Sequence, residues 1–433
     1  MLQQTLFADI DQRETKDDWT FNGASTRTLT HCYHDYPARM IPQIAAKLLT
    51  LFGPDTKRNN ILFDPYCGTG TSLVEGMMRG FDVIGTDLNP VARLIARAKT
   101  TLPDEDRLNE IYKMYRRLVR EDAFPPTETR LDEVKGITRL EYWFRPQVIQ
   151  ALGVIRAFID EIDDEAVKLF FQVAFSETVR EASNTRNGEF KLYRMSASKL
   201  ETYAPDVYGI MTEKLERNQR GLIELRENLR RLPKRPTVRV CSFNTVDGIP
   251  FEVITPNSVD IVITSPPYGD SHTTVAYGQY SRFSAAWLRM DEPHRIDSRL
   301  MGGSRDKDFH YLPSDDLNEA ISAVSDEDPK RALEVSAFYR ELCSSISNVA
   351  KTIRPGGYAC YVVGNRKVKG IVLPTDTVIR DFFTFHGYEY VDTFQRSIPN
   401  KRMPHRNSPT NERGMVDSTM VREHIVVMKR TDG

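Results

Sequence analysis

The tetrapeptide Ser265-Pro266-Pro267-Tyr268 combines residue types that can hold a polar ligand rigidly. It follows an apolar segment, 259–263, that is typical of a buried strand, with Thr264 between the two. Proline has no backbone N–H and keeps the chain extended, so the Ser265 hydroxyl and the Pro266 carbonyl can both face a ligand as hydrogen-bond acceptors. The sequence therefore predicts a rigid pair of acceptors at the end of a strand.

A pair of acceptors suits one difficult reaction, the transfer of a methyl group to the exocyclic amine of a nucleobase. Such an amine is a poor nucleophile because its lone pair is delocalised into the ring. Two acceptors on its hydrogens favour a pyramidal nitrogen and localise the lone pair toward an electrophilic methyl group. Tyr268 would offer a face on which a base extruded from the duplex can stack. The competing interpretation is a proline-rich strand exit in an ordinary enzyme.

A second candidate site is the turn Gly68-Thr69-Gly70, which stands where a predicted strand turns into a helix. Glycines there let backbone amides and the helix N-terminus approach a ligand closely. Asp87 follows Gly70 by 17 residues, at the end of the next predicted strand, where a carboxylate can accept both hydroxyls of a ribose. Leu73 stands where a dinucleotide fold has its third glycine, so the pattern favours a nucleoside ligand over a pyrophosphate. A structural turn with a helix-capping Asp is the alternative.

Alternating strands and helices must position these motifs. Residues 61–87 predict strand, turn, helix and strand, and a further helix follows at 90–99. Later strands are predicted at 237–241, 259–264, 358–363, 388–393 and 424–429, and later helices at 333–353 and 375–385. Residues 354–357, Arg-Pro-Gly-Gly, are predicted to form a turn between helix and strand.

Between the two α/β parts the pattern changes to charged amphipathic helices. They are predicted at 111–120, 147–162, 165–179 and 212–232. We therefore expect one open, mostly parallel α/β sheet of the Rossmann-like kind, interrupted by a helical insertion of about 130 residues. The expected domains are a catalytic domain from 31–104 and 236–430, an insertion at 105–235, and an N-terminal extension at 1–30.

The net charge of −1 does not indicate a polyanionic partner for the molecule as a whole, so any nucleic-acid surface must be local. Two basic clusters qualify, 180–199 with Arg186, Lys191 and Arg194, and 396–413 with Lys401 and Arg402. Asn and Arg side chains read base edges and Lys contacts phosphates. We therefore expect the insertion to be the target-recognition region. Solvated charged faces are the alternative.

Other features of the composition exclude several classes. The five cysteines are scattered without CxxC spacing, which argues against a disulfide framework and a zinc site. His31 and His34 have a spacing seen in metal sites, but no set is completed, so we predict a polar turn and no metal. No segment is apolar enough to span a membrane and no secretory signal is evident, so a cytoplasmic location is expected.

Three segments resemble motifs of a known family. Residues 63–71 and 264–268 look like motifs I and IV of the amino-group DNA methyltransferases of restriction-modification systems, and 34–42 looks like their motif X. The resemblance covers about 35–100 and 236–430. It implies the fold of S-adenosylmethionine-dependent methyltransferases. The serine form of motif IV is typical of cytosine-N4 enzymes, so cytosine in double-stranded DNA is the expected target.

The resemblance also implies roles for individual residues. The residues it places around S-adenosylmethionine are Pro37, Asp64, Tyr66, Cys67, Gly68, Gly70, Thr71 and, on the ribose, Asp87. The residues it places at the target base are Ser265, Pro266, Pro267 and Tyr268. Tyr66 departs from the phenylalanine usual at its position. The order, with the cofactor motif first, also departs from that of many cytosine-N4 enzymes and is commoner among adenine enzymes.

Several alternatives stay open at this stage. The target could be the adenine amino group, or guanine in RNA, although no separate RNA-binding domain is evident. A catalytically silent nucleic-acid-binding protein would keep the same fold. A nicotinamide oxidoreductase would have a third glycine in this turn, and this sequence lacks it. None of the five cysteines follows a proline, so a Pro-Cys nucleophile for ring-carbon methylation is not indicated.

Some features have a less defined role. The segment 269–277 is either a mobile loop that closes over the base or a static connection. Asn365 follows a strand and is a further candidate site residue. The resemblance implies a cognate restriction endonuclease as partner, but a methyltransferase without one would have the same sequence. The oligomeric state is open.

Overall fold

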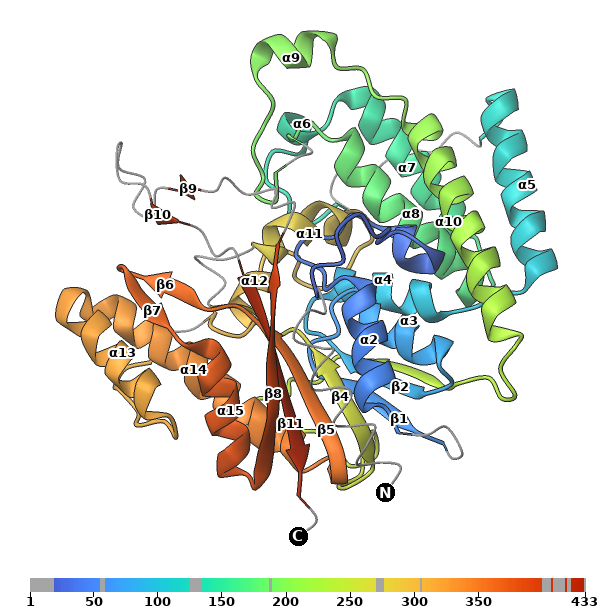
Figure 1. Ribbon diagram of the computed structural model, residues 1–433. Coiled ribbons are helices and arrows are strands. Elements are labelled where there is room, and N and C mark those ends of the chain that lie inside the picture. The colour runs from blue at the N-terminus through green and yellow to red at the C-terminus, as the bar shows by residue number, and fades with distance from the viewer. Residues whose placement is uncertain are drawn as a thin grey trace.

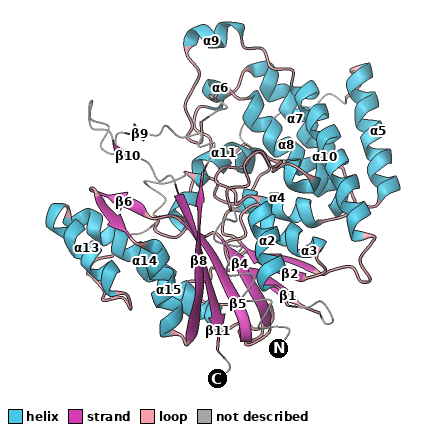
Figure 2. Ribbon diagram, in the orientation of Figure 1, coloured by secondary structure: helices cyan, strands magenta, loops and turns pink. Residues whose placement is uncertain are grey.

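Seven strands form one sheet through the middle of the molecule (Figure 2). The structure is a computed structural model that describes residues 19–54, 59–124, 134–186, 189–269, 276–303, 306–398, 406–407, 417–418 and 422–431. The strands in spatial order are β3 (Val238–Cys241), β2 (Asp82–Thr86), β1 (Ile61–Asp64), β4 (Val259–Thr264), β5 (Ile353–Val363), β11 (Arg422–Arg430) and β8 (Tyr388–Ser397).

The direction of the strands confirms the predicted mostly parallel α/β sheet. Strands β3, β2, β1, β4 and β5 run parallel, whereas β11 is antiparallel to both β5 and β8. The order of the strands along the chain reverses between β1 and β4. In open α/β sheets, ligands bind outside the carboxyl ends of the strands at such a switch point.

Helices cover both faces of the sheet (Figure 1). On one face lie α2 (Pro42–Phe52), α3 (Thr71–Met78) and α4 (Pro90–Thr100), and on the other α14 (Pro329–Ala350) and α15 (Thr375–Phe385), with α13 (Asp315–Glu327) against α14. Every residue of β4 is buried, as expected for an apolar strand covered on both faces. Neighbouring residues of β1 alternate between the two cores, because Leu62 packs with α2 and α3 and Phe63 packs with α14.

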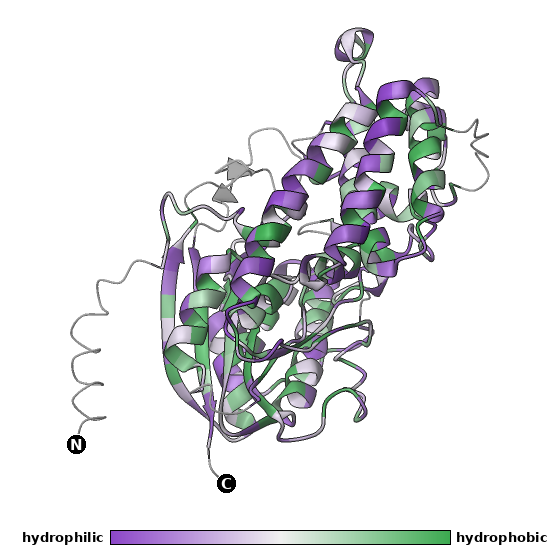
Figure 3. Cartoon of the chain, turned by 90° about the vertical axis from the view of Figure 1, so that its right-hand side faces the viewer, coloured by the Kyte–Doolittle hydropathy of each residue, from purple (hydrophilic) through white to green (hydrophobic). Residues whose placement is uncertain are grey.

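A second helical body extends from one side of the sheet. It contains α5 (Glu105–Glu121), α6 (Leu140–Trp143), α7 (Pro146–Asp160), α8 (Glu165–Ala182), α9 (Ala197–Thr202) and α10 (Val207–Leu229). Its core is shared with the α/β part, because Ile95 of α4 and Trp287 of α11 (Tyr277–Trp287) belong to the same cluster as Phe171. Its long helices carry hydrophobic and hydrophilic faces (Figure 3).

Two long helices begin four to five residues before their predicted starts, α10 at Val207 instead of 212 and α14 at Pro329 instead of 333. An aspartate caps each of them. Asp206 accepts a hydrogen bond from the Gly209 amide at 2.9 Å, and Asp328 accepts one from the Arg331 amide at 3.1 Å. Such caps satisfy backbone donors of the first turn, and a hydrophobic pattern does not contain this signal.

The predicted turn at 354–357 is wrong, because β5 already begins at Ile353. Ile353 pairs with Val259, and the register then shifts before Tyr358 pairs with Ile261. A Cβ on Gly357 would lie 2.9 Å from the Asp260 carbonyl oxygen, so glycine permits this close approach of the two strands.

The polar turn predicted at His31 and His34 is also wrong. Residues Leu29–Tyr33 form a 3-10 helix, η2, whose side chains from Thr30 to Tyr33 are buried against α10 and α4. His31 Nε2 lies 3.0 Å from Glu75 Oε1, and His34 is buried as well. Burial lowers the pKa of His31 to about 4. A buried hydrogen-bond partner 44 positions away, which no local pattern indicates, makes this segment part of the core.

The remaining elements are short. They are α12 (Ile296–Arg299), β6 (Arg366–Val368), β7 (Ile371–Leu373), β9 (Arg406–Asn407) and β10 (Asp417–Ser418). All five cysteines are free thiols. Within the part of the chain that the structure describes, no helix is long and apolar enough to cross a membrane.

Candidate active site

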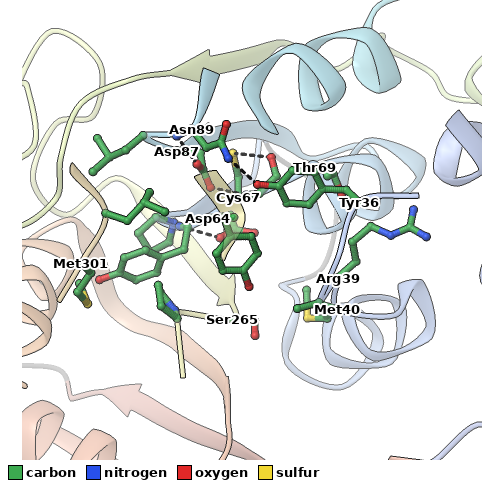
Figure 4. A pocket seen from close by; sticks show the side chains of 18 of the residues that line it. Tyr36, Arg39, Met40, Asp64, Cys67, Thr69, Asp87, Asn89, Ser265 and Met301 are labelled. Atoms are coloured by element: carbon green, nitrogen blue, oxygen red, sulfur yellow. Dashed lines mark hydrogen bonds between the residues drawn. The ribbon is translucent and has the colours of Figure 1, made fainter. Parts of the chain in front are cut away.

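A pocket opens at the carboxyl ends of β1, β2 and β4, beside the switch point of the sheet (Figure 4). Most of the residues singled out in the sequence line it together. These are Pro37, Asp64, Tyr66, Cys67, Gly68, Thr71, Asp87, Ser265 and Pro267. Figure 4 shows Tyr36, Arg39 and Met40 on one side of the pocket and Ser265 and Met301 on the other. Segments more than 200 residues apart in sequence thus form one cavity.

The Gly-rich turn forms the floor between β1 and α3. The Cys67 amide donates to the Thr86 carbonyl of β2 at 3.0 Å, and the Gly70 amide donates to the Cys67 carbonyl at 2.7 Å. Gly70 has φ +74°, and a Cβ there would lie 3.0 Å from the Ala96 Cβ of α4. Gly70 caps α3 and is not part of the pocket wall that the described residues form, so it shapes the turn from behind.

Asp87 follows β2 and points toward this turn. Its Oδ2 accepts from the Gly68 amide at 3.0 Å, and its Oδ1 accepts from the Asn89 amide at 2.7 Å. Burial raises the pKa of Asp87, and the two amide donors oppose that rise. A carboxylate has about four acceptor positions, so each oxygen can still accept a ribose hydroxyl. The pocket therefore fits the adenosine part of S-adenosylmethionine.

Asp64 joins the two motifs. Its Oδ1 accepts from the Thr264 hydroxyl at 2.5 Å and from the Tyr66 amide at 3.1 Å, and its Oδ2 accepts from the Ser72 hydroxyl. Burial raises the pKa of Asp64 to about 6, while these hydrogen bonds act in the opposite direction. Because Ser265 directly follows Thr264, the carboxylate holds the segment Ser265–Tyr268 against the Gly-rich turn.

Two further residues of the turn are anchored away from solvent. The Tyr66 hydroxyl donates to Ser345 of α14, whose hydroxyl lies 2.7 Å from that of Thr245. Burial raises the pKa of Tyr66 to about 12 and raises that of Cys67 well above its ordinary value. Both side chains are therefore neutral at physiological pH, so this part of the pocket wall is uncharged.

A pair of tyrosines in this wall was not identified in the sequence as site residues. The rings of Tyr36 and Tyr277 stack with centroids 5.9 Å apart and planes 16° apart. Asn89 Nδ2 lies 2.7 Å from the Tyr36 hydroxyl and 2.8 Å from the Ser281 hydroxyl. The position of Tyr36 inside the motif X resemblance was the available signal. Tyr277 ends the segment 269–277, of which residues 270–275 lie outside the described residues.

Only part of the motif after β4 faces the pocket. Ser265 and Pro267 line the pocket, whereas Pro266 is buried. The Ser265 hydroxyl donates to the Tyr268 hydroxyl at 3.1 Å, which donates to Glu423 of β11 at 3.0 Å. Tyr268 is not part of the pocket wall that the described residues form, so its stacking role stays a prediction.

Asn365 is not part of the pocket wall that the described residues form, and its side chain binds Asp376 instead. Its side chain and the Asp376 carboxylate and amide exchange hydrogen bonds of 2.8 and 3.1 Å at the start of α15. His424 lies 2.9 Å from the same carboxylate. Burial alone would raise the pKa of Asp376, but the hydrogen bonds from His424 and Asn365 lower it to about 2. Asn365 therefore ties β5 to α15.

In the first basic cluster, residues 184–186 pair with residues 193–195 in antiparallel fashion. The Arg186 amide donates to the Tyr193 carbonyl at 2.8 Å, and the side chains of Arg186 and Lys191 are exposed. The Arg194 guanidinium lies 4.2 Å from the centre of the Tyr142 ring. This segment contacts α11, since the Leu192 amide donates to Gln279 Oε1 at 3.4 Å. Lys401 and Arg402 lie outside the described residues.

The fold and the pocket together define the class of the protein. A Gly-rich turn and an acidic residue line a pocket at the carboxyl edge of the sheet, beside the switch point, as in S-adenosylmethionine-dependent methyltransferases. Residues 30–115 match a family model described as RMKL-like, methyltransferase domain. The Rossmann-like methyltransferase fold predicted from the sequence is confirmed.

A relative that covers nearly the whole chain narrows this class. The chain is 39% identical to the type II methyltransferase M.MvaI of Kocuria varians over 425 aligned residues. The alignment covers 94% of this chain and 93% of that protein. This protein belongs to the type II DNA methyltransferases of restriction-modification systems. Its methyl donor is S-adenosylmethionine, as the sequence predicted.

Two other comparisons are more limited. M.MjaII, a type II methyltransferase of Methanocaldococcus jannaschii, is 35% identical over 85 residues, which is 19% of this chain and 15% of that protein. The solved structure of the rRNA methyltransferase aviRa from Streptomyces viridochromogenes aligns over 92% of this chain and 88% of its own, with 10% identity and a TM-score of 0.33. The latter likeness carries no information about the substrate.

Proposed function

We propose that this methyltransferase modifies the exocyclic N4 amino group of cytosine in double-stranded DNA, after the base leaves the helix stack. The observation that carries the proposal is the place of Ser265. Its side chain lines the same pocket as Asp87 and Cys67, so an acceptor for a target amine lies beside the binding site for the methyl donor. Amino-group chemistry needs such an acceptor because the lone pair must be freed from the ring.

The residues of the pocket divide the work. S-adenosylmethionine, when bound, supplies a methyl group activated on a sulfonium sulfur. Asp87 would accept the ribose hydroxyls, and the uncharged wall around Cys67 would hold the nucleoside and exclude water. Ser265 and the Pro266 carbonyl would accept the two amino hydrogens. As the N–C bond forms and the C–S bond breaks, the C–S electron pair stays on sulfur and the nitrogen releases one proton to solvent. The methyl group passes directly to the base, so no covalent bond to the protein is needed.

The helical body at 105–235 is the proposed target-recognition region of the catalytic domain formed by 31–104 and 236–430, with an N-terminal extension at 1–30. Its segment with Arg186, Lys191 and Arg194 contacts α11, whose first residue, Tyr277, lines the pocket. Basic side chains there could contact phosphates while the base enters the pocket. Lys401 and Arg402 are proposed as a second set of DNA contacts.

Adenine is the second candidate target. The cofactor motif around Gly68 precedes the catalytic motif at Ser265 in the chain, and this order is commoner among adenine enzymes. Both bases present an amino group next to a ring nitrogen, so the acceptors at Ser265 would serve either. A cytoplasmic location in a prokaryotic cell and a cognate restriction endonuclease complete the proposal.

The product of the reaction tests the proposal directly. The purified protein is incubated with labelled S-adenosylmethionine and duplex DNA of mixed sequence, and the nucleosides are identified by mass spectrometry after digestion. N4-methylcytosine is the expected product. N6-methyladenine would overturn the base assignment and keep the mechanism, whereas label in a ring carbon would overturn the mechanism. Labelling of RNA in place of DNA would overturn the assignment of DNA as the substrate.

A further inference from the structure

A carboxylate from a distant strand reaches the catalytic motif. Glu423 of β11 follows Tyr268 by 155 positions, and its Oε1 accepts a hydrogen bond from the Tyr268 hydroxyl at 3.0 Å. The Tyr268 hydroxyl in turn accepts from the Ser265 hydroxyl at 3.1 Å. The three side chains therefore form a chain of hydrogen bonds that begins in the pocket wall and ends inside the sheet.

The far end of this chain is held by an arginine. Arg396 of β8 is the cross-strand neighbour of Glu423, and its Nη1 donates to Glu423 Oε2 at 2.9 Å. The side chain of Arg396 is 7% exposed and that of Glu423 is 15% exposed. A buried guanidinium beside the carboxylate compensates its charge, so each Glu423 oxygen accepts from a defined donor.

The number of protons fixes which group donates and which accepts in each of these hydrogen bonds. A carboxylate only accepts hydrogen bonds, so the single proton of the Tyr268 hydroxyl must point to Glu423. The Tyr268 oxygen can then only accept, and the single proton of Ser265 points to it. The pocket side of Ser265 is left with lone pairs alone.

We propose that Glu423 is a positioning residue that makes Ser265 an obligate hydrogen-bond acceptor. The inference rests on the proposed function, since an obligate acceptor favours a base with an amino group, such as cytosine, over a base with a carbonyl at the same place, such as uracil. Glu423 is not part of the pocket wall that the described residues form, so its effect on the bound base would pass through the Tyr268 hydroxyl. The discrimination between amino and carbonyl bases is then set by a residue of β11.

The substitution Glu423→Gln tests whether Glu423 sets the direction of these hydrogen bonds. The amide is nearly isosteric, but its NH₂ group can donate to the Tyr268 oxygen and allow the chain to reverse. We expect kcat to fall on the order of 10-fold or more, by analogy with the loss of one preorganised hydrogen bond, with KM for S-adenosylmethionine nearly unchanged. Glu389→Gln, which neutralises an exposed carboxylate on β8, is the matched control and should retain wild-type kinetics. Wild-type kcat in Glu423→Gln would overturn the inference.

A double mutant shows whether Glu423 acts through Tyr268. Tyr268→Phe removes the middle of the chain, so adding Glu423→Gln should lower kcat no further. Additive losses would mean that Glu423 acts by another route and would overturn the inference. Thermal unfolding of each variant shows whether the fold is intact.

A binding measurement distinguishes this inference from the proposed function. Affinities are measured for duplexes with cytosine or uracil at the target position, in the presence of S-adenosylhomocysteine. The wild type should favour cytosine, and Glu423→Gln should reduce that preference several-fold. An unchanged preference would overturn the role of Glu423 even if N4-methylcytosine is the product, whereas absence of amino methylation by the wild type would overturn the proposed function itself.

Discussion

The Asp64 carboxylate accepts a hydrogen bond of 2.5 Å from the Thr264 hydroxyl, across 200 positions of sequence. Asp64 ends β1 and Thr264 ends β4, the two strands between which the sheet order reverses. The bond ties the first residue of the cofactor turn to the residue before Ser265. In the proposed mechanism, this buried carboxylate would therefore fix the position of the target base relative to the methyl donor.

This carboxylate should make stability depend on pH. Burial raises the pKa of Asp64 from 3.8 to about 6, so the stability that the protonated group contributes is fully present below about pH 4 and is lost as pH rises through 6. The free energy of unfolding of the wild type relative to Asp64→Asn should fall by roughly 3 kcal/mol between pH 4 and pH 7. Urea unfolding at several pH values measures this difference, and a flat difference would contradict the raised pKa.

Asp87 should determine affinity for the methyl donor. Replacing it by asparagine leaves one acceptor oxygen for the ribose and the two backbone amides, so Kd for S-adenosylmethionine should rise roughly 10- to 100-fold, the usual loss for hydrogen bonds to a charged group. Calorimetric titration measures this Kd. Asp106→Asn, an exposed change on α5, should bind as the wild type does. Unchanged affinity in Asp87→Asn would exclude the ribose contact.

Ser265 should matter for the chemical step and not for binding the methyl donor. Ser265→Ala removes an acceptor that acts on the target amine, so kcat should fall roughly 100-fold while Kd for S-adenosylmethionine stays nearly constant. Single-turnover methylation with saturating donor measures the effect. Ser258→Ala is the control, because Ser258 lies just before the amino end of β4, whereas Ser265 lies just after its carboxyl end. Full activity of Ser265→Ala would remove Ser265 from the mechanism.

The basic segment beside α11 should contribute to DNA affinity. Charge reversal of both Arg186 and Lys191 should weaken binding, and it should reduce the slope of log K against log salt by about 1 for each phosphate that the variant no longer neutralises. Fluorescence anisotropy at several salt concentrations measures both quantities. The double reversal of Lys113 and Arg117, two exposed residues of α5, makes the same change in net charge and is the control. Equal slopes in all proteins would place the DNA elsewhere.

Gly70 should be intolerant of a side chain for two separable reasons. Gly70→Ala imposes a left-handed backbone on alanine and brings its Cβ to 3.0 Å from the Ala96 Cβ. Gly387→Ala has a similar φ of +79° and nothing within 4 Å of the new Cβ, so it measures backbone strain alone, about 1 kcal/mol. Chemical unfolding should show a larger loss for Gly70→Ala. Equal losses would mean that α4 moves aside freely.

Local patterns predicted the elements that depend on local physics. The apolar run of β4, the turn from Gly68 to Gly70 and the helix at 375–385 follow from periodicity and from backbone preferences, and the structure contains all three. The early starts of α10 and α14 were missed because Asp206 and Asp328 act through single capping hydrogen bonds. The buried His31 was missed because its partner, Glu75, belongs to another helix.

The sequence by itself determined the chemistry that is possible here. Ser265-Pro266-Pro267-Tyr268, the Gly-rich turn and Asp87 are local combinations whose donors, acceptors and backbone limits can be derived from residue types. Only the tertiary structure decided which side chains support them. Thr264 and Asp64, Tyr36 and Tyr277, and Tyr268 and Glu423 meet because the order of strands in the sheet and the packing of helices bring them together. Contacts between residues hundreds of positions apart depend on the whole fold, and no local pattern contains them.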